Sequence, residues 1–166
     1  MEWAPLVPYW SVLWRSGIAL AHDVSEADVA GRRVLELGCG LGVPSLAAAR
    51  GGADVLATDG DEEALELLER NARENGVAVA TACVEWADAA ALVERGMFDL
   101  VLAADVLYER ASVAQLLTLL PRLGAEAWLA DPGRPEFARF LELARERWSL
   151  ESHDRGIVTI VRANSL

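Results

Sequence analysis

Residues 34–42 read VLELGCGLG, and this stretch decides the fold of the chain. A short apolar run leads into three glycines at alternate positions, Gly38, Gly40 and Gly42. A glycine loop at the carboxyl end of a first strand lets the backbone pass close to a ligand. Glu36 stands shortly before the first glycine, so we expect its carboxylate at the tip of the strand. The stretch therefore predicts a strand, a ligand-binding loop and a helix in succession.

A second candidate strand, residues 54–59, ends in Asp59. This aspartate lies about 20 residues beyond the glycine loop, a spacing at which an acid accepts hydrogen bonds from the ribose hydroxyls of an adenosine. The glycines by themselves fit a tight strand–helix turn equally well. Together with Asp59 they favour a nucleoside site.

The nucleoside belongs either to a dinucleotide or to S-adenosylmethionine. A dinucleotide places its pyrophosphate at the helix N-terminus, commonly over a third glycine. Here Val43 occupies that position, and Pro44 follows it. Glu36 would also repel a pyrophosphate, whereas it suits the cationic amino group of a methionine moiety. We therefore predict S-adenosylmethionine as the cofactor and S-adenosylhomocysteine as the product.

Outside this region, short apolar runs alternate with stretches of helical period. The candidate strands are residues 33–37, 54–59, 77–82, 98–104, 125–131, 148–152 and 157–161. The candidate helices cover residues 61–75 and 110–123, a third begins at Pro135, and a tryptophan-rich helix begins at Trp10, before the first strand. This alternation indicates an α/β fold with a mainly parallel sheet. A connection of hairpin length joins the last two strands, so the final strand is expected to run against the others.

Composition limits the class of protein. The chain has 166 residues, of which 53% are hydrophobic, so we expect one domain over 1–166, with a helical segment in 1–30 and an α/β core in 31–166. The net charge of −11 argues against binding to nucleic acid and is compatible with a cationic partner. The 15 Lys and Arg residues are all arginine.

Two cysteines exclude a disulfide scaffold and a cysteine-based zinc site, and we expect no metal. The sequence shows neither a signal peptide nor an apolar run of membrane-spanning length, so we expect a cytoplasmic protein without membrane contact. The bias toward alanine, glycine, arginine and leucine resembles that of a GC-rich bacterial genome.

These features resemble the seven-strand, class I S-adenosylmethionine-dependent methyltransferases. The resemblance rests on Glu36, the three glycines, Asp59 and the terminal hairpin, and it covers nearly the whole chain. It implies a Rossmann-like sheet of order 3-2-1-4-5-7-6, with strand seven antiparallel and helices on both faces. It also implies that the glycine loop lies against the methionine part of the cofactor and that Asp59 holds the ribose.

Three further segments are similar to those of the protein-lysine methyltransferases in this class. They are residues 8–21 (PYWSVLWRSGIALA), 105–108 (DVLY) and 131–135 (DPGRP). The last segment resembles the branch that methylates lysines of the electron-transfer flavoprotein β-subunit, whose bacterial members are also linked to ribosomal protein L7/L12. Arg15 departs from the family pattern, which usually has proline there.

The resemblance assigns roles to four more residues. Trp86 stands at the place of the adenine-contacting turn, although it could simply cover the end of the sheet. Trp14 either closes over the cofactor or packs in the core. Asp105, after the fourth strand, would orient the acceptor amine, and Tyr108 would line the acceptor channel. The alternatives for Asp105 are a solvated loop acid and a helix cap.

The implied reaction is methyl transfer to a lysine side chain of a protein, either an electron-transfer flavoprotein β-subunit or a ribosomal protein. Tyr9 and Trp10 are further candidate walls of an aromatic channel that disfavours a charged amine. Two other interpretations stay open. The chain could be a small-molecule amine N-methyltransferase with a closed acceptor pocket, or a non-catalytic domain that keeps the fold as an interaction module. The oligomeric state is left open.

Overall fold

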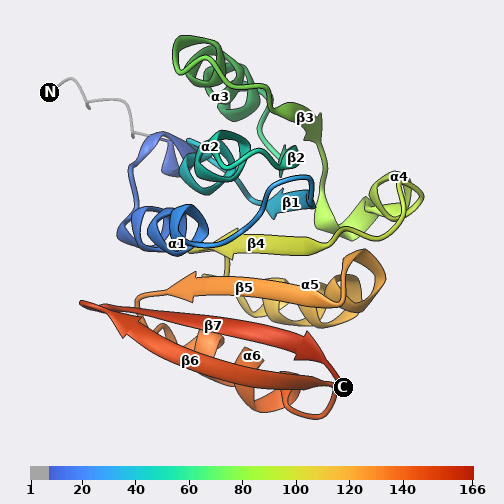
Figure 1. Ribbon diagram of the computed structural model, residues 1–166. Coiled ribbons are helices and arrows are strands. Elements are labelled where there is room, and N and C mark those ends of the chain that lie inside the picture. Colours follow the sequence, from blue (N-terminus) through green and yellow to red (C-terminus); the bar gives the residue numbers. More distant parts are fainter. Residues whose placement is uncertain (1–7) are drawn as a thin grey trace, which may run out of the picture.

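The computed structural model describes residues 8–166, which form a seven-stranded sheet of order β3-β2-β1-β4-β5-β7-β6 (Figure 1). All neighbouring strands are parallel except β7, which runs antiparallel to both β5 and β6. This confirms the predicted strand order and the reversed final strand. The strands are β1 (Arg33–Leu37), β2 (Asp54–Asp59), β3 (Ala80–Cys83), β4 (Leu100–Ala104), β5 (Glu126–Asp131), β6 (Trp148–Arg155) and β7 (Val158–Ser165).

Helices cover both faces of the sheet, as the family resemblance implies. The helices are α1 (Arg15–Glu26), α2 (Val43–Arg50), α3 (Glu62–Glu74), α4 (Ala90–Val93), α5 (Arg110–Leu123) and α6 (Pro135–Ala144), with short 3-10 turns at Tyr9–Ser11 and Trp86–Asp88. Successive strand residues point to opposite faces. Val34 therefore packs with residues of α1 and α2, and Leu35 packs with residues of α5 and α6. None of the described helices is long and apolar enough to cross a membrane.

The N-terminal helix begins later than the sequence pattern predicts. Its first residue is Arg15, and the stretch before it forms a 3-10 turn at Tyr9–Ser11 followed by extended backbone at Trp14 (φ −74°, ψ 141°). The indole N–H of Trp14 donates to the Tyr9 carbonyl oxygen at 2.9 Å, which holds this arrangement. The apolar spacing from Trp10 onward therefore reflects packing at the site rather than a continuous helix.

The third strand is also shorter than predicted, and it begins at Ala80 rather than at residue 77. Gly76 has a φ of 66°, and the Val77 N–H donates to the Ala72 carbonyl oxygen at 3.0 Å. These contacts close the end of α3, as glycine commonly does after a helix. Residue 77 therefore completes the helix end instead of starting the strand.

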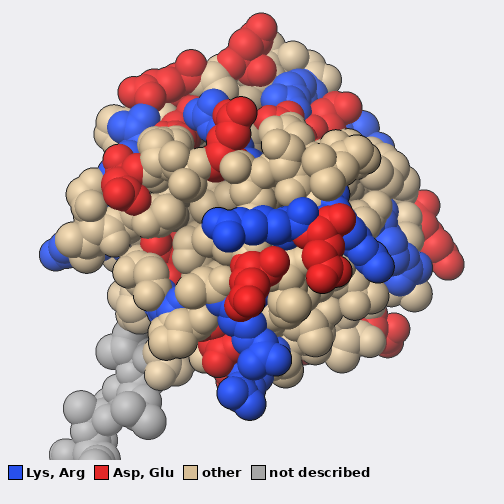
Figure 2. Space-filling view, turned by 90° about the horizontal axis from the view of Figure 1, so that it is seen from below, with Lys and Arg blue, Asp and Glu red and all other residues tan. Residues whose placement is uncertain are grey.

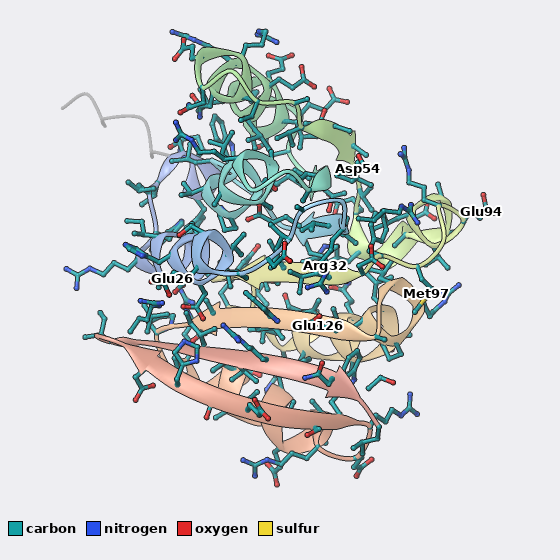
Figure 3. The ribbon with its side chains drawn as sticks, in the orientation of Figure 1. Glu26, Arg32, Asp54, Glu94, Met97 and Glu126 are labelled. Atoms are coloured by element: carbon teal, nitrogen blue, oxygen red, sulfur yellow. The ribbon has the colours of Figure 1, made fainter. Side chains whose placement is uncertain are left out.

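An ion pair ties three strands together at the amino edge of the sheet. Nη2 of Arg32, just before β1, lies 2.5 Å from Oε2 of Glu126, the first residue of β5 (Figure 3). The same nitrogen donates to the carbonyl oxygen of Asp99, just before β4, at 2.7 Å. The loops that line the cavity lie at the opposite, carboxyl ends of the strands, as is usual in α/β sheets.

Candidate active site

A cavity of about 950 Å³ opens at the carboxyl ends of the central strands. It is lined by every residue that the sequence singles out: Trp14, Glu36, Gly38, Gly40, Gly42, Asp59, Trp86, Asp105 and Tyr108. These residues come from loops that are far apart in the chain. The parallel sheet brings the loops together because it aligns the carboxyl ends of β1, β2 and β4.

The glycine loop adopts a backbone that side chains would disrupt. Gly38, Gly40 and Gly42 have φ values of 62°, 48° and 68°, all in the left-handed region that favours glycine. A Cβ on Gly42 would also stand 2.3 Å from a methyl carbon of Leu68 in α3, and one on Gly40 would stand 3.2 Å from the Trp10 carbonyl oxygen. The loop therefore offers bare backbone to whatever occupies the cavity.

Glu36 lies at the end of β1 with only 1% of its surface exposed. Among residues 8–166, Ser45 in α2 is its hydrogen-bond partner, and the Ser45 backbone N–H and hydroxyl donate to Oε2 at 2.9 and 2.5 Å. The pKa of Glu36 is raised from 4.5 to about 8, because burial and, to a smaller extent, the nearby charge of Asp59 raise it by more than the Ser45 hydrogen bonds lower it. The site thus contains a buried acid for which the described residues supply no cation.

Asp59 connects two loops beneath the cavity. Its Oδ2 accepts from the Gly40 N–H at 2.9 Å, and its Oδ1 accepts from the Asp61 N–H at 3.1 Å. A carboxylate oxygen has room for a second donor, so these contacts leave capacity for ribose hydroxyls. The expectation that Asp59 holds the ribose fits this position and stays a prediction.

The two candidate tryptophans have different environments. Trp86 is half-buried and packs against the hydrophobic core that Leu35 shares with residues of α5 and α6. It also lines the cavity near Gly38. It therefore covers the end of the sheet and also faces the site. Trp14 is 37% exposed, so its interpretation as a core residue is wrong. Contact of either ring with the cofactor stays a prediction.

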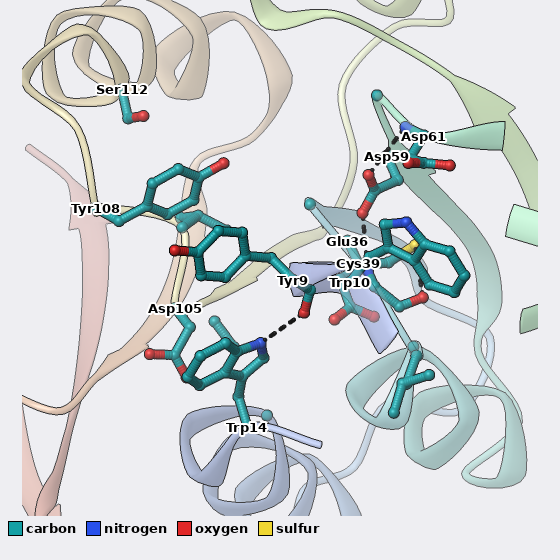
Figure 4. A pocket seen from close by; sticks show the side chains of 18 of the residues that line it. Tyr9, Trp10, Trp14, Glu36, Cys39, Asp59, Asp61, Asp105, Tyr108 and Ser112 are labelled. Atoms are coloured by element: carbon teal, nitrogen blue, oxygen red, sulfur yellow. Dashed lines mark hydrogen bonds between the residues drawn. The ribbon is translucent and has the colours of Figure 1, made fainter. Parts of the chain in front are cut away.

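Three aromatic rings form one side of the cavity mouth (Figure 4). The Tyr9 ring is stacked between the rings of Trp14 and Tyr108. Its centroid lies 6.2 Å from that of Trp14, with an interplanar angle of 19°, and 6.4 Å from that of Tyr108, with an interplanar angle of 11°. Tyr9 and Tyr108 are 82% and 67% exposed, so the rings form an open rim rather than a closed pocket. Partial burial and the charges of Glu109, Asp59 and Glu85 raise the pKa of Tyr108, which keeps its hydroxyl neutral.

Asp105 enters the cavity after β4 in an unusual conformation. Its φ is 58°, and it is the one non-glycine residue with positive φ among those that the structure describes. Its side chain is 7% exposed, and its Oδ1 accepts from Nη1 of Arg134 at 2.5 Å. Glu109 is the N-cap of α5. The alternatives of a helix cap and a solvated loop acid are therefore both wrong.

Arg134, like the lining acids Asp61, Glu85 and Glu109, is a site residue that we did not predict. Its Nη1 also lies 2.9 Å from Oδ2 of Asp131, at the end of β5, so one guanidinium joins two buried carboxylates. The resemblance of segment 131–135 to the family is the sequence signal that points to Arg134. Its partner Asp105 is 29 positions away, so the sequence could not show the pairing.

The cavity is predominantly negative. Six acidic residues line its described part, together with one guanidinium, that of Arg134. The acidic residues are Glu36, Asp59, Asp61, Glu85, Asp105 and Glu109, and Glu36, with its pKa of about 8, is the one that is mostly neutral at pH 7. Because Arg134 is already paired with Asp105 and Asp131, the field in the cavity favours cationic groups over phosphates.

Solved structures with the same fold define the class. The chain matches a ribosomal protein L11 methylase from Lactobacillus delbrueckii subsp. bulgaricus with a TM-score of 0.76 at 22% identity, covering 99% of this chain and 91% of that one. It matches a T. thermophilus 16S rRNA methyltransferase, solved with AdoMet and guanosine, with a TM-score of 0.76 at 20% identity over 93% and 44% of the two chains. The fold is that of the class I S-adenosylmethionine-dependent methyltransferases.

Within this class, a family model described as lysine methyltransferase matches residues 10–128. The chain belongs to this lysine methyltransferase family. It is 36% identical over 137 residues to the electron transfer flavoprotein beta subunit lysine methyltransferase of Danio rerio, covering 78% of this chain and 52% of that one. It is 34% identical over 122 residues to protein N-lysine methyltransferase METTL21A of Danio rerio, covering 69% and 56%.

A further relative is named as an O-methyltransferase rather than a lysine methyltransferase. A ubiquinone biosynthesis O-methyltransferase of Methylococcus capsulatus is 31% identical over 135 residues, covering 80% of this chain and 56% of that one. The chain spans about half the length of each of these three relatives.

The residues around the cavity fit S-adenosylmethionine, the cofactor of this class. The decisive observation is Glu36, a buried acid without a cation, because the methionine part of the cofactor carries an amino group that would supply one. The glycine loop would lie against the methionine part of the cofactor. Asp59 would bind the ribose, and Trp86 would contact the adenine. The whole set lies in one cavity.

Proposed function

We propose that this protein transfers a methyl group from S-adenosylmethionine to the side-chain nitrogen of a lysine in a protein, of the electron-transfer flavoprotein β-subunit or ribosomal protein type. The observation that carries the proposal is the charge of the cavity, in which five carboxylates, counted without the mostly protonated Glu36 and its pKa of about 8, accompany a single, already paired guanidinium. Such a site attracts a lysine ammonium and repels phosphate-bearing acceptors.

The aromatic rim supports a protein acceptor. Tyr9, Trp14 and Tyr108 form an open edge rather than a closed pocket, so a side chain presented by a large partner can enter. Aromatic faces also attract ammonium and methylated ammonium groups by cation–π interaction. A small amine would need a more enclosed pocket to lose a comparable share of its surface to the protein.

The chain's part in the chemistry is positioning and control of protonation. The bound cofactor supplies an electrophilic methyl group. A lysine ammonium has no lone pair, so it must first release a proton to solvent. The nitrogen–carbon bond then forms as the carbon–sulfur bond breaks, the sulfur keeps the electron pair, and the new methylammonium can release a second proton. The rim and Asp105 would align the nitrogen for this in-line displacement.

Incubation with S-[methyl-³H]adenosylmethionine tests the proposal, with purified electron-transfer flavoprotein, ribosomal protein L7/L12 and a lysate as acceptors. We expect labelled methyl-lysine after hydrolysis of the acceptor protein. The chain has no lysine of its own, so any methyl-lysine must come from the acceptor.

The two ends of β2 offer a matched control. Asp59→Asn should lower the rate at least about tenfold by weakening ribose contacts, whereas Asp54→Asn, exposed at the other end of the strand, should leave it unchanged. Label found only in small metabolites of the lysate would replace the proposal with a small-molecule methyltransferase. Absence of S-adenosylmethionine binding by calorimetry would leave the interaction-module interpretation.

A further inference from the structure

A carboxylate beside the acceptor nitrogen creates a difficulty for lysine methylation. A negative charge near an amine stabilises its protonated form and so raises its pKa. The reaction needs the neutral amine. Asp105 can therefore align the acceptor only if something offsets its charge.

Arg134 supplies that offset in the structure. Its Nη1 lies 2.5 Å from Oδ1 of Asp105 and 2.9 Å from Oδ2 of Asp131. The side chains of Asp105 and Asp131 are 7% and 2% exposed, and that of Arg134 is 27% exposed, so the cluster is largely shielded from screening by solvent. Burial lowers the pKa of Arg134, but the hydrogen bonds to the two aspartates outweigh it and the net direction is upward, so the guanidinium stays charged.

The local fold delivers this guanidinium to the cavity. Oδ1 of Asp131 accepts from the backbone N–H groups of Gly133 and Arg134 at 2.8 and 2.7 Å, which fixes the turn after β5. Pro135 then begins α6 directly after Arg134. The side chain of Arg134 is thus held between the carboxylates of Asp131 and Asp105. The backbone of Asp105 is itself strained, with a φ of 58°.

We propose that Arg134 is a positioning residue that fixes the Asp105 carboxylate and compensates its charge, so that the acceptor lysine can become neutral beside it. This inference rests on the proposed function. It differs from a purely structural role in its prediction for pH dependence. Replacing a residue with a purely structural role would lower the rate equally at every pH. Replacing a residue that compensates the charge of Asp105 would change the pH at which the acceptor lysine becomes reactive.

Other charged and titratable groups face the same space and stay unchanged in the test. In the cavity lining they are Tyr9, Glu36, Cys39, Asp59, Asp61, Glu85, Tyr108 and Glu109, and the Arg110–Glu136 pair at 3.8 Å lies between α5 and α6. Their contributions are common to the wild type and the variants, so the shift between variants reports on Arg134.

The kinetic test compares Arg134→Gln, Arg134→Lys and the double variant Arg134→Gln/Asp105→Asn, with purified electron-transfer flavoprotein as the acceptor. For Arg134→Gln, we expect kcat/KM near pH 7.5 to fall about tenfold and the rising limb of the pH profile to move upward by about one unit. Arg134→Lys keeps a positive charge and should move the limb less. The double variant removes the carboxylate beside the acceptor and leaves only Asp131 without its cation, so the rising part of the pH profile should return toward its wild-type position at a lower maximum rate.

Arg139→Gln is the matched control, because Arg139 is an exposed arginine one turn further along α6. Its pH profile should be that of the wild type. A fall in Arg134→Gln that is uniform across pH would overturn the proposal in favour of a structural role, and an unchanged profile would overturn it outright.

A second measurement needs no acceptor. Thermal unfolding of the wild type, Arg134→Gln, Asp105→Asn and the double variant Arg134→Gln/Asp105→Asn forms a double-mutant cycle for Arg134 and Asp105. We expect Arg134→Gln to lower the Tm by about 2–4 °C when Asp105 is present and to have a smaller effect when Asp105 is replaced. Additive effects would show that the ion pair does not hold Asp105. If the wild type methylates no protein lysine, the proposed function fails even though this coupling is present.

Discussion

The carboxyl group of Glu36 illustrates how a single residue couples folding, pH and ligand binding. Its surroundings were assembled by the fold, with Ser45 donating twice and with no cation among the described partners. With a pKa of about 8, most of the ligand-free protein holds this group protonated at pH 7. A cationic amino group beside it would reverse that preference.

Binding of S-adenosylmethionine near pH 7 should therefore release a proton from Glu36. Calorimetric titrations in buffers of different ionisation enthalpy measure that proton directly, and we expect release approaching one proton per site. Glu36→Gln should abolish the release and weaken binding by roughly 10- to 100-fold, since a charge-assisted hydrogen bond is lost. Release that is unchanged in Glu36→Gln would assign the proton to another group.

The same pKa makes a stability prediction with a definite sign. The folded state keeps the Glu36 proton up to about pH 8, while the unfolded state loses it near the ordinary value of 4.5. The folded state therefore binds more protons between these values, and its stability falls as the pH rises through this window. Relative to Glu36→Gln, the ligand-free wild type should lose on the order of 4 kcal/mol between pH 5 and 8. Urea unfolding of both proteins at several pH values measures the difference, and parallel curves would contradict it.

At the scale of elements, a buried aspartate ties the N-terminal helix to the last hairpin. Asp23 in α1 is 1% exposed, and its carboxylate meets His153 at 2.8 Å, Arg162 at 3.3 Å and the guanidinium of Arg155. Arg162 also lies over the Trp128 ring at 4.1 Å. Because α1 follows directly from the aromatic rim, this cluster anchors the element that leads into the site.

Asp23→Asn should destabilise the protein, because it leaves the cations of β6 and β7 without their shared carboxylate. These cations are partly exposed, so we expect about 2 kcal/mol rather than the full cost of breaking a buried pair. That corresponds to a fall in Tm of about 4–8 °C. Asp28→Asn, at an exposed position just beyond α1, is the control and should leave the Tm unchanged. Equal Tm values for the two variants would show that the cluster does not anchor the helix.

At the scale of the whole molecule, the net charge of −11 is distributed unevenly. The lining of the cavity is strongly acidic, whereas the face seen from the side of β6 and α6 interleaves arginine with acidic side chains (Figure 2). Negative charge thus lines the opening through which an acceptor would enter. Such fields steer association and weaken as salt rises.

The KM for a basic protein acceptor should consequently rise severalfold between about 0.05 and about 0.5 M salt. The affinity for S-adenosylmethionine should change much less, because its contacts are enclosed. Steady-state rates for the acceptor and calorimetry for the cofactor, in the same salt series, separate the two. A KM that is independent of salt would mean that the cavity field does not guide the acceptor.

Much of the fold and of the site was predictable from local patterns. The strand order followed from the resemblance, the reversed last strand from its short hairpin, and helix α5 from the apolar spacing over Arg110–Leu123. The glycine loop and Asp59 were recognisable because a tight turn and an acid at a strand end are encoded within a few residues.

Contacts between distant segments depended on the tertiary structure. Arg134 meets Asp105 across 29 positions, and Arg155 meets Asp23 across 132, because the sheet order places their elements side by side. In the sequence, Asp23 reads as one more polar residue of an amphipathic helix. Local spacing records periodicity and turns, whereas the partner of a charged side chain is set by which strands are neighbours, and only the folded chain decides that.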